Sequence, residues 1–516
     1  MDQRKIKRRI SFILLTSIIQ MCFGVPLQSI SVCLFQINFE AINKYEIVKE
    51  VPKVDPPDVF SIISASNKES KMPMHEGDIA LVMGRSAIKC DGDTCRWTKN
   101  NTGMVNVPYT ISSEFSDDYV SIIQKAMQEF ETLTCVRFAN RTTESDYVQI
   151  VVQSGCWSYL GKIGGGQQLS LVPECMTHGS VQHELNHALG FYHEQSRSDR
   201  DNYVTVLLDN VLLGTAPNFQ KYDSNNLGLE YDYSSVMHYG RYAFSKTNNL
   251  PTIVPIPDSS VNIGQRYGLS TLDIAKINKL YQCGLCRGLF SNSTGSIISS
   301  NYPNNYPKNT DCMWLIRIPS NQIFLQFSAF DVEASSDCVS DYLRIYDGPS
   351  RSSPLLLDRS CGAGQLPPMI STGTTMLIEF VSDNMIEATG FKASYSTVTC
   401  GALLTNSSGT ISSPMYPANY PPSMDCTWAI NAPPGFVVSL NITDFNVEFM
   451  STCAFDYLLV FNGPQTTSPL IGRYCGKGVK VPSIRSTGNS LLLQFHSDTS
   501  IQLAGFFSKY AFVRQN

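Results

Sequence analysis

A framework of four cysteines occurs twice in the C-terminal half of the chain, and this repeat constrains the fold more than any other feature. Successive cysteines are 26, 26 and 23 residues apart in the first copy and 26, 27 and 22 residues apart in the second. The two sets are Cys286, Cys312, Cys338 and Cys361, and Cys400, Cys426, Cys453 and Cys475. A period of about 115 residues predicts two tandem domains.

Each copy has the pattern of an all-β domain. Short β-rich runs such as 376–381 and 491–496 are separated by Gly, Pro, Asn and Ser, which is typical of a β-sandwich. With Asp-Tyr-Leu at 341–343 and 456–458, and Gly-Phe at 390–391 and 505–506, both copies resemble CUB domains. The resemblance implies CUB domains at 286–399 and 400–516. It also implies the disulfides Cys286–Cys312, Cys338–Cys361, Cys400–Cys426 and Cys453–Cys475.

The first residues have the pattern of a secretory signal. Lys and Arg residues precede an apolar run at 10–23 and Gly24, so we expect a signal peptide at 1–24 and a secreted, extracellular protein. The alternative is an uncleaved anchor, but a membrane span needs about 20 apolar residues and this run is shorter and interrupted by polar ones. No later stretch could span a bilayer.

Cysteine content and glycosylation motifs also favour export. The chain has 16 cysteines, which predict disulfides in an oxidising compartment; Cys22 lies in the signal, and the role of Cys33 stays open. Five Asn-X-Ser/Thr motifs predict glycosylation, at Asn100, Asn140, Asn292, Asn406 and Asn441. The net charge of −5 makes nucleic acid an unfavourable partner.

Residues 86–285 have a mixed pattern that predicts an α+β domain. Ser116 can cap a helix whose apolar face includes Val120, Ile123, Met127 and Phe130. A strand is expected at 147–152. The preceding segment, 25–85, contains Pro and has no regular pattern, so we expect an irregular propeptide rather than a packed unit.

A histidine motif at 183–193 carries the chemistry of this domain. His183 and His187 are four residues apart and would stand on one face of a helix, where both can bind one ion. Gly190 can end the helix in a left-handed conformation, which lets His193 return to the metal. Three nitrogen ligands and one open position are typical of a catalytic zinc. The alternatives are a chance match or a solvated His pair, which the additional Gly and His disfavour.

The residue after the first ligand, Glu184, cannot bind the metal with it but can contact a water in the open position. Glu184 is therefore the candidate general base. The complete run at 183–201, HELNHALGFYHEQSRSDRD, resembles the signature of the astacin family of metzincins. We therefore expect a multidomain chain, in which an α+β astacin-like zinc protease domain precedes the two CUB sandwiches.

Further roles follow from the astacin resemblance alone. It implies that Met237 forms a turn under the zinc and that Tyr239 stabilises the tetrahedral intermediate; without it, Met237 would be plain core and Tyr239 a surface aromatic. It also implies disulfides, assigned as Cys90–Cys95, Cys135–Cys283 and Cys156–Cys175.

Latency is a second implication of the family resemblance. Asp78 in the sequence His-Glu-Gly-Asp at 75–78 would bind the zinc in the precursor, although His75 replaces the Phe of the family motif. The alternative is an ordinary Gly-Asp turn. An activating protease would cut between Arg85 and Ser86, and the new terminus would be buried near Glu194.

Both CUB domains have candidate calcium ligands. Many CUB domains bind Ca²⁺ through one glutamate and two aspartates, and hard oxygen ligands suit this ion. The candidates are Glu333, Asp341 and Asp383, then Glu448, Asp456 and Asp498. Because surface carboxylates are common, a plain acidic surface is an equal alternative.

Together these patterns predict a secreted zinc endopeptidase that is made as a latent precursor. One astacin domain followed by two CUB domains most resembles vertebrate hatching enzymes, particularly amphibian ones, which digest the egg envelope; egg-envelope glycoproteins are therefore the expected substrate. One alternative is a protease that processes matrix proteins or growth-factor antagonists. Another is an inert binding protein that acts through its CUB domains, which the intact Glu184 and histidines disfavour.

Overall fold

The computed structural model describes residues 57–81, 94–247, 250–265 and 267–515. The expected signal peptide, Cys33, the Cys90–Cys95 disulfide and the Arg85–Ser86 cleavage site involve residues outside these ranges. Within the described ranges, none of the helices has both the length and the apolar character needed to cross a membrane.

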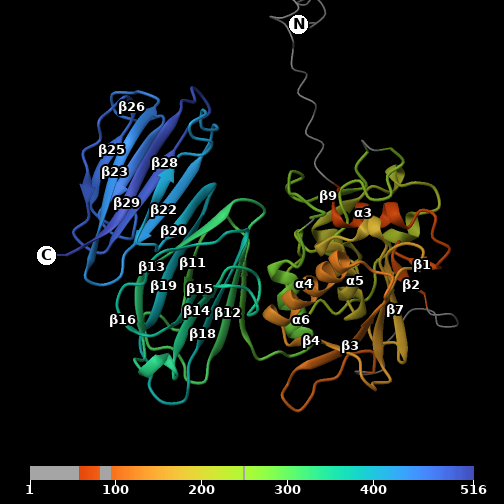
Figure 1. Cartoon of the computed structure of the whole chain (residues 1–516). Coiled ribbons are helices and arrows are strands. Elements are labelled where there is room, and N and C mark those ends of the chain that lie inside the picture. Colours follow the sequence, from red (N-terminus) through yellow and green to blue (C-terminus); the bar gives the residue numbers. More distant parts are fainter. Residues whose placement is uncertain (1–56, 82–93, 248–249, 266, 516) are drawn as a thin grey trace, which may run out of the picture. The chain divides into compact units, whose positions relative to one another are not determined.

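The N-terminal part is built on one mixed sheet with the order β1-β2-β6-β7-β5-β3-β4, and helices lie beside it (Figure 1). The strands are β1 (Met74–His75), β2 (Ile79–Ala80), β3 (Val105–Ile111), β4 (Val136–Asn140), β5 (Tyr147–Val151), β6 (Trp157–Ser158) and β7 (Gly166–Ser170). The helices are α3 (Val59–Ser66), α4 (Asp117–Leu133), α5 (His178–Ala188) and α6 (Thr271–Leu280). A separate pair, β8 (Val204–Val206) and β9 (Ile253–Pro255), completes this part.

Helix α4 forms where its periodicity predicts a helix. The Ser116 side chain accepts a hydrogen bond from the backbone N–H of Tyr119, which satisfies one of the free donors at the helix start. Ile123, Met127 and Phe130 are buried on one face, so the helix covers the core of the sheet.

The expectation of an irregular segment at 25–85 is wrong for residues 57–81. These residues form α3 and the β1–β2 hairpin, and Phe60 and Ile63 are almost completely buried. The segment has too few apolar residues for a core of its own, and Val59 and Ile63 instead pack into the core of the following domain. It is ordered by the surface that it covers.

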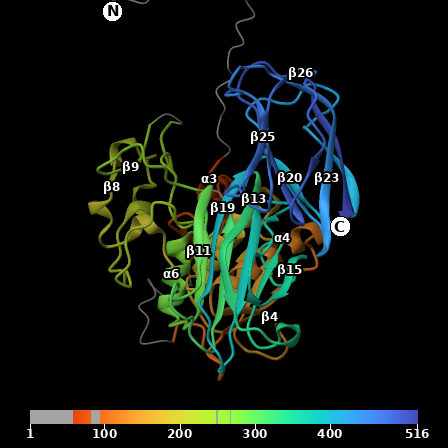
Figure 2. The same ribbon diagram turned by 90° about the vertical axis from the view of Figure 1, so that its left-hand side faces the viewer.

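Both C-terminal repeats fold as β-sandwiches, as predicted. In the first, one sheet has the order β10-β12-β18-β14-β15 and the other β11-β19-β13-β16, with β17 paired to β13; Figure 2 shows β11, β19 and β13 side by side. The strands are β10 (Cys286–Phe290), β11 (Thr294–Ile298), β12 (Asp311–Arg317), β13 (Gln322–Val332), β14 (Tyr342–Tyr346), β15 (Leu355–Ser360), β16 (Gly362–Ala363), β17 (Met369–Ile370), β18 (Thr375–Val381) and β19 (Gly390–Val398).

The second repeat has the same topology, with sheets β20-β22-β28-β24-β25 and β21-β29-β23-β26, and β27 paired to β23. Its strands are β20 (Cys400–Leu404), β21 (Ser408–Ser412), β22 (Asp425–Asn431), β23 (Phe436–Val447), β24 (Tyr457–Phe461), β25 (Leu470–Tyr474), β26 (Gly476–Lys477), β27 (Ile484–Arg485), β28 (Ser490–His496) and β29 (Gly505–Arg514).

Six disulfides connect described residues. They are Cys135–Cys283, Cys156–Cys175, Cys286–Cys312, Cys338–Cys361, Cys400–Cys426 and Cys453–Cys475. The first ties the segment after α4 to the segment after α6.

Candidate active site

Helix α5 carries the first two histidines of the motif on one buried face. Thr177 caps the helix by accepting a hydrogen bond from the N–H of Ser180 at 3.2 Å. The rings of His183 and His187 are 4.8 Å apart between centroids, as expected for side chains one turn apart. The helix ends at Ala188, and Gly190 has φ +104°, a backbone conformation that only Gly adopts without strain.

This turn brings His193 back to the two helical histidines, and Asp78 meets them from the β1–β2 hairpin. The Nε2 atoms of His183 and His193 are 3.1 Å apart. An Asp78 oxygen lies 3.0 Å from His183 Nε2 and 3.3 Å from His193 Nε2, and its other oxygen lies 3.5 Å from His187 Nε2. All four side chains are buried.

Each imidazole is oriented by a hydrogen bond from its other nitrogen. Because the partner is an acceptor in every case, Nδ1 carries the proton and the Nε2 lone pair faces the centre of the cluster. The contacts are His183 Nδ1 to Val236 O at 2.8 Å, His187 Nδ1 to Phe191 O at 2.7 Å and His193 Nδ1 to a Glu76 carboxylate oxygen at 2.7 Å.

This donor set fits zinc. Three imidazole nitrogens and one carboxylate oxygen converge with their ligand atoms within 4.8 Å of one another, and zinc prefers four such ligands in a tetrahedron with metal–ligand distances of about 2.0–2.2 Å. Neither His187 Nε2 nor one Asp78 oxygen has a hydrogen-bond partner among the described residues, although both are buried. Such unsatisfied atoms are expected where a metal ion is bound.

Asp78 and Glu184 are two buried carboxyl groups with opposite behaviour. Burial alone would raise the pKa of Asp78, but its close contacts with His193, His187 and His183 outweigh burial and hold the pKa well below the usual range. Burial and the nearby negative charge of Asp78 raise the pKa of Glu184 well above its usual range. Asp78 is therefore the ionised carboxylate of the site.

The Glu184 carboxylate lies near enough to Asp78 for that charge to affect its pKa. Both of its carboxylate oxygens are buried, and neither has a hydrogen-bond partner within the described ranges. A carboxylate in this state needs a proton, a water molecule or a substrate to satisfy it.

Met237 and Tyr239 are the next two residues with predicted roles at the site. Met237 is buried, and its carbonyl accepts a hydrogen bond from the N–H of Glu194 at 3.0 Å. Tyr239 is completely buried, with its ring centroid 4.6 Å from that of His193, so the alternative of a surface aromatic is wrong. Its hydroxyl donates to the carbonyl of Glu76 at 2.5 Å.

Several contacts made by residues 57–81 had no signal in the sequence. Glu76 holds His193 as described and also accepts from the hydroxyl of Ser196. Phe60 stacks on Tyr239 with ring centroids 3.8 Å apart. Asn67 is hydrogen-bonded to both the N–H and the carbonyl of Cys156, at 2.6 and 2.7 Å. Residues 57–81 therefore contact His193, Tyr239 and the segment that leads into β6, in addition to the contacts of Asp78.

Glu194 is buried beside the site, where Arg197 and Lys276 form ion pairs with it. The second partner comes from α6, far along the chain, and was not expected from the sequence. Ser86 lies outside the described residues.

The acidic residues of both sandwiches gather at one end of each domain. The groups Glu333, Asp341 and Asp383, and Glu448, Asp456 and Asp498, each have ligand oxygens within 4.8 Å of one another. Exposed acidic groups often occur without an ion, but one Glu oxygen in each group is buried and lacks a partner among the described residues. Burial and the neighbouring aspartates raise the pKa of Glu333 and of Glu448.

A tyrosine that was not expected to have a role at this end of the domain organises each acidic group. The Tyr306 hydroxyl donates to Asp341 at 2.5 Å and accepts from the N–H of Glu333 at 3.0 Å. The same two contacts occur at Tyr420, with Asp456 and Glu448. The repeated Tyr-Pro pairs were the available signal.

All five predicted glycosylation sites have exposed asparagines, which is a requirement for modification. They are Asn100, Asn140, Asn292, Asn406 and Asn441.

Comparison with known proteins gives matches to both kinds of domain. The model of the astacin peptidase family matches residues 93–282, and the CUB domain model matches 286–395 and 400–510. The chain is 47% identical to embryonic protein UVS.2 of Xenopus laevis over 98% of this chain and 99% of that protein. It is 48% identical to the astacin-like metalloendopeptidase of Gallus gallus, over 65% of this chain and 82% of that one.

Among solved structures, the chain matches high choriolytic enzyme 1, a hatching enzyme zinc-protease from Oryzias latipes (medaka fish). The identity is 51%, the match covers 38% of this chain and 100% of that one, and the TM-score is 0.37.

Proposed function

The chain belongs to the astacin family of zinc metalloendopeptidases and carries two CUB domains, and from this premise we propose that His183, His187 and His193 hold its zinc. The observation that carries the assignment is the convergence of their Nε2 atoms, each with its Nδ1 proton engaged elsewhere. Zinc, when bound there, supplies a Lewis acid that activates water at neutral pH.

Glu184 is the proposed general base. It follows a zinc ligand on α5, and its buried carboxylate has no partner among the described residues, so it is free to accept a proton from the attacking water and pass it to the leaving amine. The Tyr239 hydroxyl, once released from the Glu76 carbonyl, donates a hydrogen bond to the developing oxyanion.

In the latent precursor, Asp78 occupies the position that the water requires. Its contacts with all three histidines support this role. Cleavage between Arg85 and Ser86 by an activating protease would release it.

The proposed substrate is an extracellular protein, specifically an egg-envelope glycoprotein. The support is the architecture, in which two CUB domains follow the protease directly, and the nearly full-length similarity to an embryonic protein of Xenopus laevis. The alternative is a protease that processes matrix proteins or growth-factor antagonists. The signal-like N-terminus, the disulfides and the exposed sequons support secretion.

Calcium in the CUB domains is a further part of the proposal. Each acidic group has three carboxylates and a buried Glu oxygen that lacks a partner among the described residues, and Ca²⁺ prefers such oxygen ligands.

The test of the catalytic assignment is digestion of casein by the activated protein. We expect digestion to stop when a chelator removes zinc and to return when zinc is added. The Glu184→Gln variant should retain zinc but lose at least about 100-fold in kcat, the usual scale for a general base. An active Gln variant would refute the role of Glu184, and chelator-resistant digestion would refute the metal.

The substrate is tested separately. Isolated egg envelopes are incubated with the activated enzyme or with the Glu184→Gln variant, and released fragments are identified by mass spectrometry. Fragments that depend on Glu184 are expected. Digestion of casein without any envelope fragments would exclude the envelope as substrate and leave the peptidase assignment intact. A third outcome, zinc binding and partner binding without any hydrolysis, would favour the inert binding protein.

A further inference from the structure

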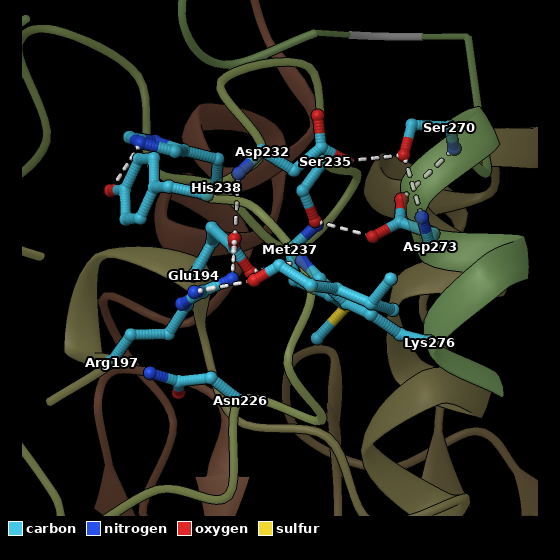
Figure 3. Close-up of polar contacts among 12 residues, drawn as sticks. Glu194, Arg197, Asn226, Asp232, Ser235, Met237, His238, Ser270, Asp273 and Lys276 are labelled. Carbon is cyan, nitrogen blue, oxygen red and sulfur yellow. Dashed lines mark hydrogen bonds and ion pairs between the residues drawn. The ribbon is translucent and has the colours of Figure 1, made fainter. Parts of the chain in front are cut away.

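The carboxylate of Glu194 is buried, and both of its oxygens accept hydrogen bonds from described residues. One oxygen accepts from Arg197 Nη1 at 3.0 Å and from the N–H of Asp232 at 2.8 Å; the other accepts from Lys276 Nζ at 2.5 Å. Figure 3 shows these side chains grouped around Glu194. The side chains of Glu194 and Lys276 are only 5% and 9% exposed, so this is a buried ion pair.

Of the two cations that contact this carboxylate, Lys276 is the one that is not shared with another acidic residue of the described ranges. Arg197 divides its guanidinium between Glu194 and both oxygens of Asp199, and it also donates to two backbone carbonyls. Lys276, in contrast, has Glu194 as its single ion-pair partner among the described residues. Removing one member of a buried pair leaves an uncompensated charge, which is strongly destabilising.

The pair lies next to the zinc ligands. Glu194 directly follows His193, and its N–H donates to the carbonyl of Met237. Its carboxylate therefore anchors the chain directly after the third histidine.

Helix α6 brings a second anchor to the same place. Asp273, one turn before Lys276, accepts from the Ser235 hydroxyl at 2.6 Å and from the N–H of Val236 at 2.8 Å. The Val236 carbonyl in turn accepts from His183 Nδ1. One face of α6 thus holds the segment that orients His183 and, through Lys276, the segment that carries His193.

We propose that Lys276 is a positioning residue that supplies the cation for Glu194, so that the active enzyme does not require the ammonium group of a newly cut N-terminus for this purpose. The inference rests on the proposed catalytic role of the three histidines. A cavity borders the pair, lined by Leu160, Gly161, Tyr192, Glu194, Asn226 and Lys276. A terminus that enters this cavity meets a carboxylate whose two oxygens are already bonded.

The test compares two N-termini in two backgrounds. The full-length wild type and the Lys276→Met variant are each given an engineered cleavage site that leaves either Ser86 or Gly-Ser-Ser86 as the first residues. For the wild type, we expect the extension to change kcat less than about twofold. For Lys276→Met, we expect kcat to fall at least about tenfold with the extended terminus, KM to stay within about twofold, and Lys276→Arg to restore activity.

Lys279→Met is the matched control, because Lys279 is an exposed lysine on the same helix; it should behave as wild type with either terminus. A wild type that loses as much kcat from the extension as Lys276→Met does would overturn the proposal. So would a Lys276→Met enzyme with normal kcat and an extended terminus. A wild type that is inactive with both termini would instead contradict the proposed function.

A double variant covers the case in which Lys276→Met fails to fold. If the defect is an unpaired carboxylate, Glu194→Gln combined with Lys276→Met should restore folding and zinc content, because both charges of the pair are then absent. A double variant as defective as the single one would mean that Lys276 acts through packing, and the proposal would be wrong.

Discussion

At the residue scale, the proposed latency depends on two carboxylates of residues 57–81 that contact different atoms. Asp78 faces the Nε2 atoms of all three histidines, whereas Glu76 binds the outer nitrogen of His193 and, through its carbonyl, the hydroxyl of Tyr239. Loss of Asp78 would therefore open the proposed metal position without releasing the rest of residues 57–81.

We expect the uncleaved Asp78→Ala precursor to gain peptidase activity of at least about tenfold over the wild-type precursor, and the Glu76→Ala/Asp78→Ala double variant to gain more. The physical reason is that a buried charged ligand competes with water for zinc. The measurement is hydrolysis of a fluorogenic peptide, with gel analysis to confirm that the chain is uncut.

Glu69→Ala is the matched control, because Glu69 is an exposed acidic residue of the same segment; this precursor should stay inactive. An Asp78→Ala precursor that remains fully inactive, although it binds zinc, would contradict the aspartate switch.

At the scale of elements, α4 is tied to the first CUB domain by a buried ion pair. Glu129 on α4 accepts from Arg317 of β12, and its other oxygen lies 3.1 Å from His178 Nε2 at the start of α5. Burial opposes the charge, but Arg317 and His178 outweigh it and lower the pKa of Glu129 to about 2.

This lowered pKa makes a prediction about acid stability. A carboxyl group whose pKa falls on folding stabilises the native state above its unfolded pKa of about 4.3, and this stabilisation is lost as the pH falls toward about 2. The shift corresponds to roughly 3 kcal/mol. We expect Glu129→Gln to lower the melting temperature at pH 7 and to flatten its decline between pH 5 and about 2, measured by calorimetry.

Glu131→Gln serves as a control of opposite sign on the same helix, since burial raises the pKa of Glu131. It should not destabilise the protein at pH 7, and it should steepen the acid decline rather than flatten it, because protonation of Glu131 favours the folded state as the pH falls. An acid decline in Glu129→Gln equal to that of the wild type would show that the pair contributes nothing.

The acidic groups at the strand ends of the CUB domains lead to a second prediction at this scale. We expect Ca²⁺ to raise the melting temperature of the CUB domains and to release heat in a titration of the full-length protein, because each ion would relieve the repulsion among three carboxylates. Glu333→Gln and Glu448→Gln should each remove about half of the heat. No heat in the wild type would exclude these calcium sites.

At the scale of the whole molecule, one sheet of each CUB domain buries its outer face as well as its inner one. It is the sheet β10-β12-β18-β14-β15 in the first domain and the equivalent sheet β20-β22-β28-β24-β25 in the second. In the first domain, Leu289, Met313, Leu315, Tyr346 and Leu377 belong to the core of the protease domain. In the second, Ala429, Phe461 and Leu492 pack with Phe324, Ile370 and Val398 of the first. Each domain therefore covers apolar surface of the one before it.

We expect removal of residues 399–516 to leave the melting temperature of the protease domain unchanged, and removal of 286–516 to lower it by several degrees. The second deletion exposes apolar side chains that are each worth about 1.5–3 kcal/mol when buried. Calorimetry of the two truncated chains measures this, and the first truncation is the control. Equal melting temperatures in all three chains would show that the interface is not stabilising.

The sequence determined what local spacing can encode. The i, i+4 pair of His183 and His187 with a Gly before His193 predicts three convergent ligands, and Ser116 before an apolar periodicity predicts α4. The repeated cysteine spacing predicts two sandwiches of one topology. Each of these depends on residues close in the chain or on a comparison of one copy with the other.

Only the tertiary structure decided which distant residues support the site. Glu76 meets His193, Lys276 meets Glu194 and Arg317 meets Glu129 across 82 to 188 residues of chain, and an isolated Glu, Lys or Arg has the same appearance in a sequence whether it is solvated or buried in a pair. The order of α3 also depends on the surface beneath it. Folding decides these partners because the cost of burying a charge is met only where an opposite charge arrives from elsewhere in the chain.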